Sequence, residues 1–213
     1  MIQEIDFNGW FFKLLFKYRI KCNVFLFNRI IHILCYIKKV KIGNNVRFNG
    51  FPKVHRFPDS KITIGNGCLF NSSKNSIIVG LQKPCILFTF AKGSEIIIGD
   101  NSGASGATII AASSIKVGKN VLIGANSTIV DNDFHSSDPS QRTLDAIPTK
   151  PIIIEDNVFL GFNCMVLKGV TIGENSVIGA NSVVISNIPK NSIAIGNPCK
   201  VMIQRNWSGS QPV

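Results

Sequence analysis

The sequence predicts an all-β solenoid, in which short parallel strands coil around one narrow core. The repeat has twelve steps, and in each an aliphatic residue is followed three positions later by asparagine or glycine. In the longest unbroken block, from Ile154 to Val184, these steps are six residues apart. A period of six fits neither an amphipathic helix nor simple strand alternation, but it fits short strands that each end in a sharp corner.

Each part of the repeat has a physical reason. The aliphatic positions are expected to point inward, and they are Ile42, Ile64, Ile98, Val117, Ile123, Ile129, Ile154, Leu160, Val166, Ile172, Ile178 and Val184. The residues three positions later should turn the corners, because asparagine and glycine enter the left-handed backbone region at low cost. They are Asn45, Gly67, Asn101, Asn120, Asn126, Asn132, Asn157, Asn163, Gly169, Asn175, Asn181 and Asn187. One repeat cannot bury its own apolar face, so the coils must stack.

Two stretches of the repeat carry a family resemblance. Residues 158–173 contain VFLG and LKGVTIG, and residues 196–201 read GNPCKV. In these stretches the chain resembles the hexapeptide-repeat acyltransferases, and among them the O-acetyltransferases of capsule, lipopolysaccharide and exopolysaccharide synthesis. The resemblance spans residues 42–205 and is strongest after Ile98. It implies a left-handed parallel β-helix, acetyl-CoA as cosubstrate without a metal, and a homotrimer with active sites between subunits.

Charge and composition suggest three regions. We expect a basic, amphipathic helical segment at residues 1–41, the β-helix at 42–198 with a projecting loop at 135–153, and a tail at 199–213. The net charge is +11, and residues 1–41 hold eight Lys or Arg against two acids. Because this excess is local and no nucleic-acid-binding motif accompanies it, nucleic acid is not an expected partner.

The amino-terminal segment is apolar but interrupted by charge. Lys13, Lys17 and Lys21 lie four residues apart, so one side of a helix would be basic and the other apolar. Residues 10–37 contain no uncharged apolar stretch of about 18 residues, so a membrane span is not expected. The segment is predicted to contact the inner face of the cell membrane peripherally, or to pack under the solenoid or on another subunit. The protein is expected in the cytoplasm.

The six cysteines show no close pairing and no spacing typical of a metal site. Cys164 and Cys199 fall within the family-like stretches. Reduced thiols in a cytoplasmic protein explain this scatter best, and Cys164 is interpreted as a packing residue rather than a nucleophile.

The repeat breaks at one informative place. After Val117, Ile123 and Ile129, the six-residue register requires an aliphatic residue at position 135, where the chain has His135. Regular steps resume at Ile154, so residues 135–153 should leave the coil as a loop. The string Asp131-Asn132-Asp133-Phe134-His135 resembles the one that carries the catalytic histidine in the family. His135 is therefore predicted to be a general base, with Asp133 or Asp131 orienting its ring, unless these carboxylates only shape the loop.

The resemblance also places a CoA site. It implies that Gly161, Phe162 and Ala180 face the cosubstrate, that Lys200 contacts a CoA phosphate, and that Ser105 borders the acceptor pocket. Lys200 could instead be a solvated surface lysine, and Ser105 a residue of a tight corner. Two positions depart from the family pattern: Phe159 replaces the usual tryptophan, and Ile185-Ser186 replaces a frequent Thr-Lys pair.

The predicted function is transfer of an acetyl group from acetyl-CoA to a sugar hydroxyl in surface polysaccharide biosynthesis. Acetylation of an amine, on an amino sugar or an antibiotic, is the alternative enzymatic reading. A structural or membrane-attached binding solenoid is the non-enzymatic one, and it would leave the loop after His135 unexplained.

Overall fold

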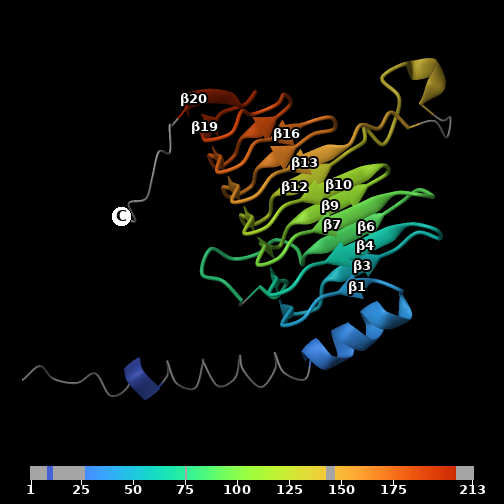
Figure 1. Ribbon diagram of the computed structural model, residues 1–213, viewed down its shortest axis with the longest axis vertical. Coiled ribbons are helices and arrows are strands. Elements are labelled where there is room, and N and C mark those ends of the chain that lie inside the picture. Colours follow the sequence, from blue (N-terminus) through green and yellow to red (C-terminus); the bar gives the residue numbers. More distant parts are fainter. Residues whose placement is uncertain (1–8, 12–26, 75, 143–146, 205–213) are drawn as a thin grey trace, which may run out of the picture.

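The computed structural model describes residues 9–11, 27–74, 76–142 and 147–204. The chain winds as a left-handed, three-sided prism, passing through sheets A, B and C in turn once per coil (Figure 1). We name the edges of the prism AB, BC and CA after the sheets that each corner joins. The predicted β-helix is confirmed.

The three sheets share one topology. Sheet A contains β1 (Lys41–Ile42), β4 (Lys61–Ile64), β7 (Glu95–Ile98), β10 (Ser114–Val117), β13 (Ile152–Ile154) and β16 (Thr171–Ile172). Sheet B contains β2 (Arg47–Asn49), β5 (Leu69–Asn71), β8 (Gly103–Ser105), β11 (Leu122–Ile123), β14 (Phe159–Leu160), β17 (Val177–Ile178), β19 (Ser192–Ile195) and β20 (Lys200–Gln204). Sheet C contains β3 (Lys53–His55), β6 (Ile86–Thr89), β9 (Thr108–Ala111), β12 (Thr128–Val130), β15 (Met165–Val166) and β18 (Val183–Val184).

The strand register reproduces the sequence repeat. Ile154 pairs with Ile172 in a parallel ladder, 18 positions later, which is one coil of three six-residue steps. Val117 pairs with Ile154, 37 positions later. That offset is one coil plus 19 residues, so the extra residues leave the prism between β12 and β13 as predicted.

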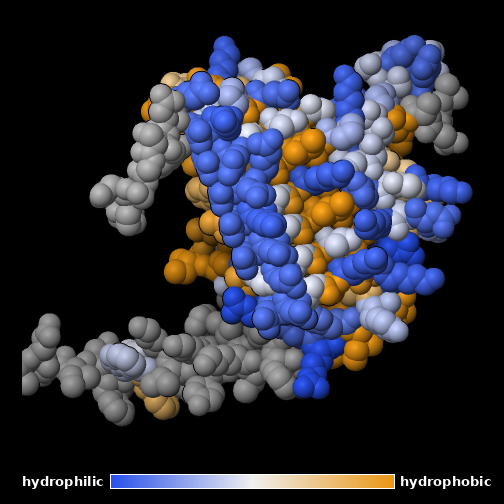
Figure 2. Space-filling view, viewed as in Figure 1, coloured by the Kyte–Doolittle hydropathy of each residue, from blue (hydrophilic) through white to orange (hydrophobic). Residues whose placement is uncertain are grey.

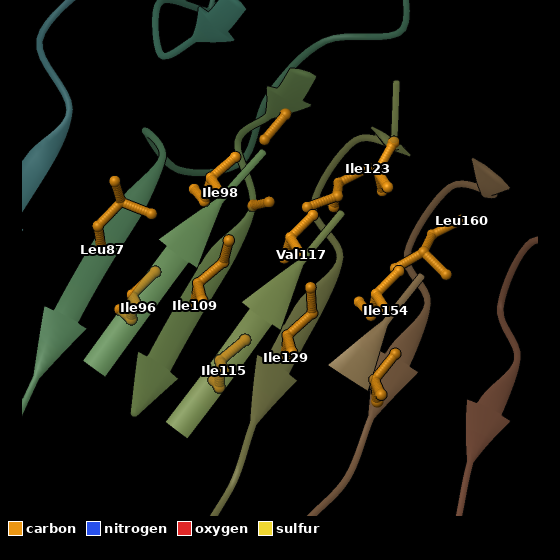
Figure 3. Close-up of a cluster of buried hydrophobic side chains, with 14 of the residues drawn as sticks. Leu87, Ile96, Ile98, Ile109, Ile115, Val117, Ile123, Ile129, Ile154 and Leu160 are labelled. Carbon is orange, nitrogen blue, oxygen red and sulfur yellow. The ribbon is translucent and has the colours of Figure 1, made fainter. Parts of the chain in front are cut away.

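The core is a single column of mostly aliphatic side chains along the prism axis (Figure 3). Ile109, Ile129 and Leu160 are completely buried, and each comes from a different coil. Burying such a side chain contributes about 1.5–3 kcal/mol. Because every coil adds its own set, the solenoid supplies a rigid scaffold along its whole length.

Most of the predicted corners have the expected backbone. Ten of the twelve Asn and Gly positions have positive φ, and the exceptions are Asn132 and Asn187. At Asn132 the chain leaves the prism and forms an antiparallel bridge with Thr149, so its backbone is not a corner. The Asn187 side chain instead accepts a hydrogen bond from the Thr171 N–H (2.8 Å), and the positive φ moves to Asn191.

The AB edge is held by a ladder of side-chain amides. Asn120 donates to Asn157 (3.0 Å), Asn157 to Asn175 (3.1 Å), and Asn175 to Asn191 (3.0 Å). This edge forms a continuous hydrophilic stripe beside the more apolar outer face of sheet A (Figure 2). Each amide pairs with its neighbours, so the stripe locks the stacking of successive coils.

A helix covers the first coil. Its described part is residues 27–37, and the buried Ile31 and Cys35 pack on the core. The Asn28 amide bonds both backbone groups of Phe48, with Nδ2 to the carbonyl at 3.0 Å and Oδ1 to the N–H at 2.7 Å. The predicted packing beneath the solenoid therefore holds for these residues, whereas Lys13, Lys17 and Lys21 lie outside the described residues. No helix within the described ranges is long and apolar enough to cross a membrane.

The carboxyl-terminal end differs from the expected tail. Strand β20 folds back antiparallel on β19, with Ile195 opposite Lys200, after the turn Gly196-Asn197-Pro198-Cys199. Cys199 is buried, and its N–H donates to the Val183 carbonyl (2.8 Å). This hairpin ends the parallel stacking, and residues 200–204 belong to sheet B rather than to a tail.

A second insertion leaves the prism at the BC edge. Residues 72–85 connect β5 to β6, where regular coils turn within a few residues. The loop lies along the edge toward the carboxyl-terminal coils, because the Gln82 N–H donates to Asn126 Oδ1 (3.0 Å). The sequence showed only an interrupted repeat in this region.

Candidate functional site

The loop that carries His135 leaves sheet C at the end of β12 and returns to sheet A at β13, so it projects from the CA edge (Figure 1). The Lys150 N–H donates to the Asp131 carbonyl (2.9 Å), which closes the base of the loop. A short 3-10 helix, Pro139–Gln141, forms its outer part, with Asp138 as the amino-terminal cap. The histidine is thus held on a stem anchored in two sheets.

The backbone before His135 turns sharply. The His135 N–H donates to the Asp133 carbonyl (2.7 Å) across Phe134, whose φ is 60°. Asn132 Oδ1 accepts from the Phe134 N–H (3.0 Å) and holds the turn from below. A positive φ is unfavourable for an aromatic residue, and such backbone is typical of functional loops.

The His135 ring is solvent-exposed, and its Nδ1 lies 3.3 Å from the Arg142 carbonyl oxygen. A carbonyl can only accept, so this bond requires the proton to be on Nδ1. In the neutral ring, Nε2 then carries a free lone pair. The Arg142 carbonyl therefore orients the imidazole, a role that the sequence assigned to a carboxylate, and leaves Nε2 able to accept a proton.

Asp131 has a structural position instead of the expected one beside the histidine. Its carboxylate is completely buried and accepts from the Ala112 N–H and the Ser113 N–H, both at 2.7 Å. The Asn132 amide also donates to it (3.2 Å). The prediction that Asp131 orients the His135 ring is therefore wrong, because its oxygens are committed to the corner between β9 and β10.

Asp133 does not contact the imidazole either. Its carboxylate forms an ion pair with the Lys168 ammonium, which comes from the next coil at the same edge. This pair ties the base of the loop to the corner after β15. Its predicted role as the ring's hydrogen-bond acceptor is taken by the Arg142 carbonyl.

The positions expected to face CoA form one column on the BC edge. Hydrogen bonds between coils connect the corners: Asn126 N–H to the Ser105 carbonyl (3.0 Å), Asn163 N–H to the Ala125 carbonyl (2.7 Å), and Asn181 N–H to the Phe162 carbonyl (2.8 Å). The structure therefore brings Ser105, Phe162 and Ala180 onto the same edge. Phe162 and Ala180 are exposed there.

Gly161 shows how close the coils lie at this edge. A Cβ on Gly161 would lie 2.7 Å from the Ala180 nitrogen and 2.9 Å from the Ile178 oxygen. Gly161 is buried between coils, so it leaves no room for a side chain and does not itself face solvent, whereas the neighbouring Phe162 does. Lys200 is exposed on β20, toward the carboxyl-terminal end of the column.

Ser105 adjoins a groove of about 400 Å³ on the outside of sheet B. Its hydroxyl accepts from the Asn71 amide (2.9 Å), as expected for a residue of a tight corner. Arg47, Leu122 and Phe159 also line the groove, where Gly103 leaves space between neighbouring side chains.

One chain does not unite the two halves of the predicted site. The His135 loop leaves the CA edge, whereas Ser105, Phe162 and Ala180 lie on the BC edge, with the width of sheet C between them. The resemblance implies such a separation, because it places the active site between subunits.

The cysteines follow the packing interpretation. The five in the described part of the chain are free and buried, and burial raises the pKa of the Cys164 thiol. A raised pKa disfavours the thiolate, so Cys164 is confirmed as a packing residue.

Comparison with known proteins identifies the family. The model of the hexapeptide repeat of succinyl-transferase matches residues 114–130, 151–186 and 170–201. A hexapeptide-repeat-containing acetyltransferase from Vibrio cholerae is 32% identical with a TM-score of 0.50, and the match covers 56% of this chain and 69% of that one. The chain belongs to the hexapeptide-repeat acyltransferase family.

Other members of the family are similar over comparable lengths. Galactoside O-acetyltransferase of Lactococcus lactis is 46% identical over 101 residues, which are 47% of this chain and 48% of the relative. A galactoside acetyltransferase in complex with coenzyme A is 38% identical with a TM-score of 0.51, covering 56% of this chain and 60% of that one. The chain spans about half the length of the curated relatives that it matches.

Proposed function

We propose that this protein transfers an acetyl group from acetyl-CoA to a hydroxyl group of a sugar in surface polysaccharide biosynthesis. The observation that carries the proposal is the His135 loop. It interrupts the solenoid at a position where the repeat requires a core residue, and it places His135 Nδ1 next to the Arg142 carbonyl. Similarity to acetyltransferases named for galactosides supports a saccharide acceptor. The cosubstrate follows from the family and from a similar acetyltransferase whose structure contains coenzyme A.

The chemistry needs one base and no covalent enzyme intermediate. His135 Nε2 takes the proton of the acceptor hydroxyl as that oxygen attacks the thioester carbonyl carbon. The resulting tetrahedral intermediate expels the CoA thiolate by breaking the C–S bond. The imidazolium then returns its proton to the thiolate, which releases CoA and the acetyl ester. The Arg142 carbonyl holds the ring throughout, because it accepts from Nδ1 in both protonation states.

Thiol release from acetyl-CoA tests this function directly. The purified protein is assayed with galactosides, maltose, uronic acids and oligosaccharides, and in parallel with amino sugars and aminoglycosides. We expect CoA release with hydroxyl acceptors and an ester product by mass spectrometry. Turnover of amines alone would replace O-acetylation by N-acetylation, and no turnover with any acceptor would favour a binding solenoid.

Lys200 is proposed to bind a CoA phosphate. Replacing Lys200 by Met should raise the KM for acetyl-CoA about tenfold, as expected for loss of one charge-assisted contact, with kcat little changed. Lys190→Met, an exposed lysine of the last coil, serves as the control. With acetyl-pantetheine, which has no phosphate groups, the effect should vanish. An equal effect on both donors would argue against the assignment.

We propose that the active form is a homotrimer. The two halves of the site lie on different edges of one prism, so a neighbouring chain is needed to bring His135 to the BC column. This arrangement agrees with the oligomer expected from the sequence.

The helix at the amino-terminal end is proposed to contact the membrane surface. Its outer face exposes apolar side chains at helical spacing, namely Ile30, Ile33, Leu34 and Ile37, and basic residues follow at Lys38, Lys39 and Lys41. An apolar stripe next to clustered cations is typical of helices that bind anionic bilayers.

Vesicle sedimentation tests this contact. The double variant Ile33→Ser, Ile37→Ser should bind vesicles that contain anionic lipid at least about tenfold more weakly than wild type. Ile78→Ser, Val79→Ser removes two apolar residues that are at least comparably exposed, from the 72–85 loop, and is the matched control. Unchanged binding of the helix variant would show that this face is not the membrane contact.

A further inference from the structure

We propose that Lys83, together with Thr108 and Thr128, forms a subsite for an anionic oxygen group, a carboxylate or a phosphate, on the acceptor saccharide. The subsite lies at the BC edge, where the 72–85 loop meets sheet C. The inference rests on the proposed function and specifies its acceptor class. It assigns a role to the second insertion, which the transfer chemistry alone does not use.

The loop carries Lys83 to a fixed place. Its residues 81–83 lie across Gly106, where a Cβ would meet the Lys83 carbonyl oxygen at 2.7 Å and Leu81 Cδ2 at 3.0 Å. Leu81 is buried, and the Gln82 N–H donates to Asn126 Oδ1. Residues 81–83 therefore contact two successive coils. These contacts fix the position of the Lys83 backbone.

The Lys83 ammonium has a hydroxyl partner but no carboxylate. Its Nζ lies 3.3 Å from Thr128 Oγ1, and no Asp or Glu in the described chain lies within ion-pairing distance of it. Partial burial lowers the pKa of this ammonium, because desolvation disfavours its charged form. This half-buried ammonium therefore has no negative charge beside it to compensate its own, and an anionic ligand would supply that charge.

A second polar group at the same place has no partner. Thr108 is paired with Thr128 in the register of sheet C, and both begin their strands at the BC edge. Thr108 is 7% exposed, and its Oγ1 makes no hydrogen bond within the described residues. An unmade hydrogen bond of a buried hydroxyl costs about 1–3 kcal/mol. A ligand oxygen seated between Lys83 and the two threonines would satisfy it.

The position along the edge indicates which substrate this subsite serves. Lys200 lies toward the carboxyl-terminal end of the BC column. Ala180, Phe162 and Ser105 come next, in that order, toward the amino-terminal coils. Lys83 lies at the opposite end, and its ammonium meets Thr128 in the coil that leads into the His135 loop. If CoA phosphate occupies the Lys200 end, a second cation at the far end is placed for the acceptor. Its site is therefore expected to select acidic sugars or sugar phosphates over neutral ones.

Three acceptors that differ in one group test the subsite: glucose, glucuronate and glucose 1-phosphate. In the wild-type protein the KM for one or both anionic sugars should be at least about tenfold lower than that for glucose. Lys83→Met should abolish this difference while leaving the KM for glucose and for acetyl-CoA unchanged. Lys83→Arg should retain it. Lys74→Met, an exposed lysine of the same loop, is the control for net charge.

The two anionic probes separate the sources of the charge, since preference for glucuronate indicates a carboxylate and preference for glucose 1-phosphate a phosphate. Equal KM values for all three sugars, or an anion preference that survives Lys83→Met, would overturn the subsite. Calorimetric binding of the same probes needs no turnover. If no sugar reacts but an anionic sugar binds in a Lys83-dependent manner, the proposed function fails and the subsite stands. If neither anionic sugar binds more tightly than glucose, the subsite fails.

Discussion

Replacing His135 by Gln should lower kcat/KM by about 10²–10⁴, because the variant retains a polar side chain of similar size but has no group that accepts the hydroxyl proton. The loop is anchored independently of the ring, through Asp131, Asn132 and the Lys168 ion pair, so folding should be little affected. Steady-state CoA release, with acetyl-CoA and the acceptor each varied at one fixed pH, measures the loss.

Two controls make this result interpretable. Ser137→Ala changes an exposed residue of the same loop and should have wild-type kinetics. Thermal unfolding of His135→Gln should match that of wild type, because the ring is exposed and bonds only to a carbonyl. A His135→Gln variant with full activity would remove the proposed base.

Mixing variants tests whether the base acts between subunits. In the proposed trimer, assemblies of His135→Gln chains would lack the proposed base, and assemblies of Ala180→Trp chains should lack CoA binding, because a large side chain would cover the exposed column. Co-refolded mixtures should regain activity, since some interfaces would combine an intact loop with an intact BC edge. Mixtures without activity would mean that both halves act within one chain.

The repeat predicted the scaffold because the residues that form each strand and corner lie within six positions of one another. The six-residue steps predict both the inward aliphatic residues, such as Ile129 and Leu160, and the corners, such as Asn120 and Asn157. Stacked coils require an apolar residue and a corner at these places. The loop at His135 was predictable for the same reason, since a polar residue in a core position forces the chain outward.

The interior of the loop was not predictable in this way. Asp131 and Asp133 flank the same short turn, and sequence alone does not show which backbone or cation each carboxylate meets. Their partners come from distant residues, Ala112 and Ser113 for one and Lys168 for the other. The Arg142 carbonyl carries no side-chain signal at all, because any residue could supply it.

The second insertion left a signal that was ambiguous. Ile64 pairs with Ile98, 34 positions later, which is two fewer than two regular coils. Such an offset can mean irregular coils or one coil plus a loop, and the polar run Ser72-Ser73-Lys74 fits either reading. In the sequence nothing distinguishes Lys83 from other lysines. Only the fold of the loop places its ammonium beside Thr128.

Asp131 should be the largest single contributor to the stability of the loop base. Its buried carboxylate accepts two backbone N–H groups at 2.7 Å, and hydrogen bonds to charged groups contribute about 1.5–3 kcal/mol each. Asp131→Ala leaves the Ala112 and Ser113 donors without their partner, so we expect unfolding free energy to fall by about 3 kcal/mol. Urea unfolding at one fixed protein concentration measures this, because association would otherwise change the apparent stability.

Asp133→Ala is the matched comparison, since it removes a carboxylate two positions away. Its ion pair with Lys168 is partly exposed, and such pairs contribute about 0–1 kcal/mol. The two variants should therefore differ in stability by at least about 2 kcal/mol. Both should retain a kcat close to that of wild type, because neither carboxylate contacts the imidazole. A large loss of kcat in Asp133→Ala alone would show that Asp133 orients the ring, and equal losses of stability would contradict the contributions assigned to the two carboxylates.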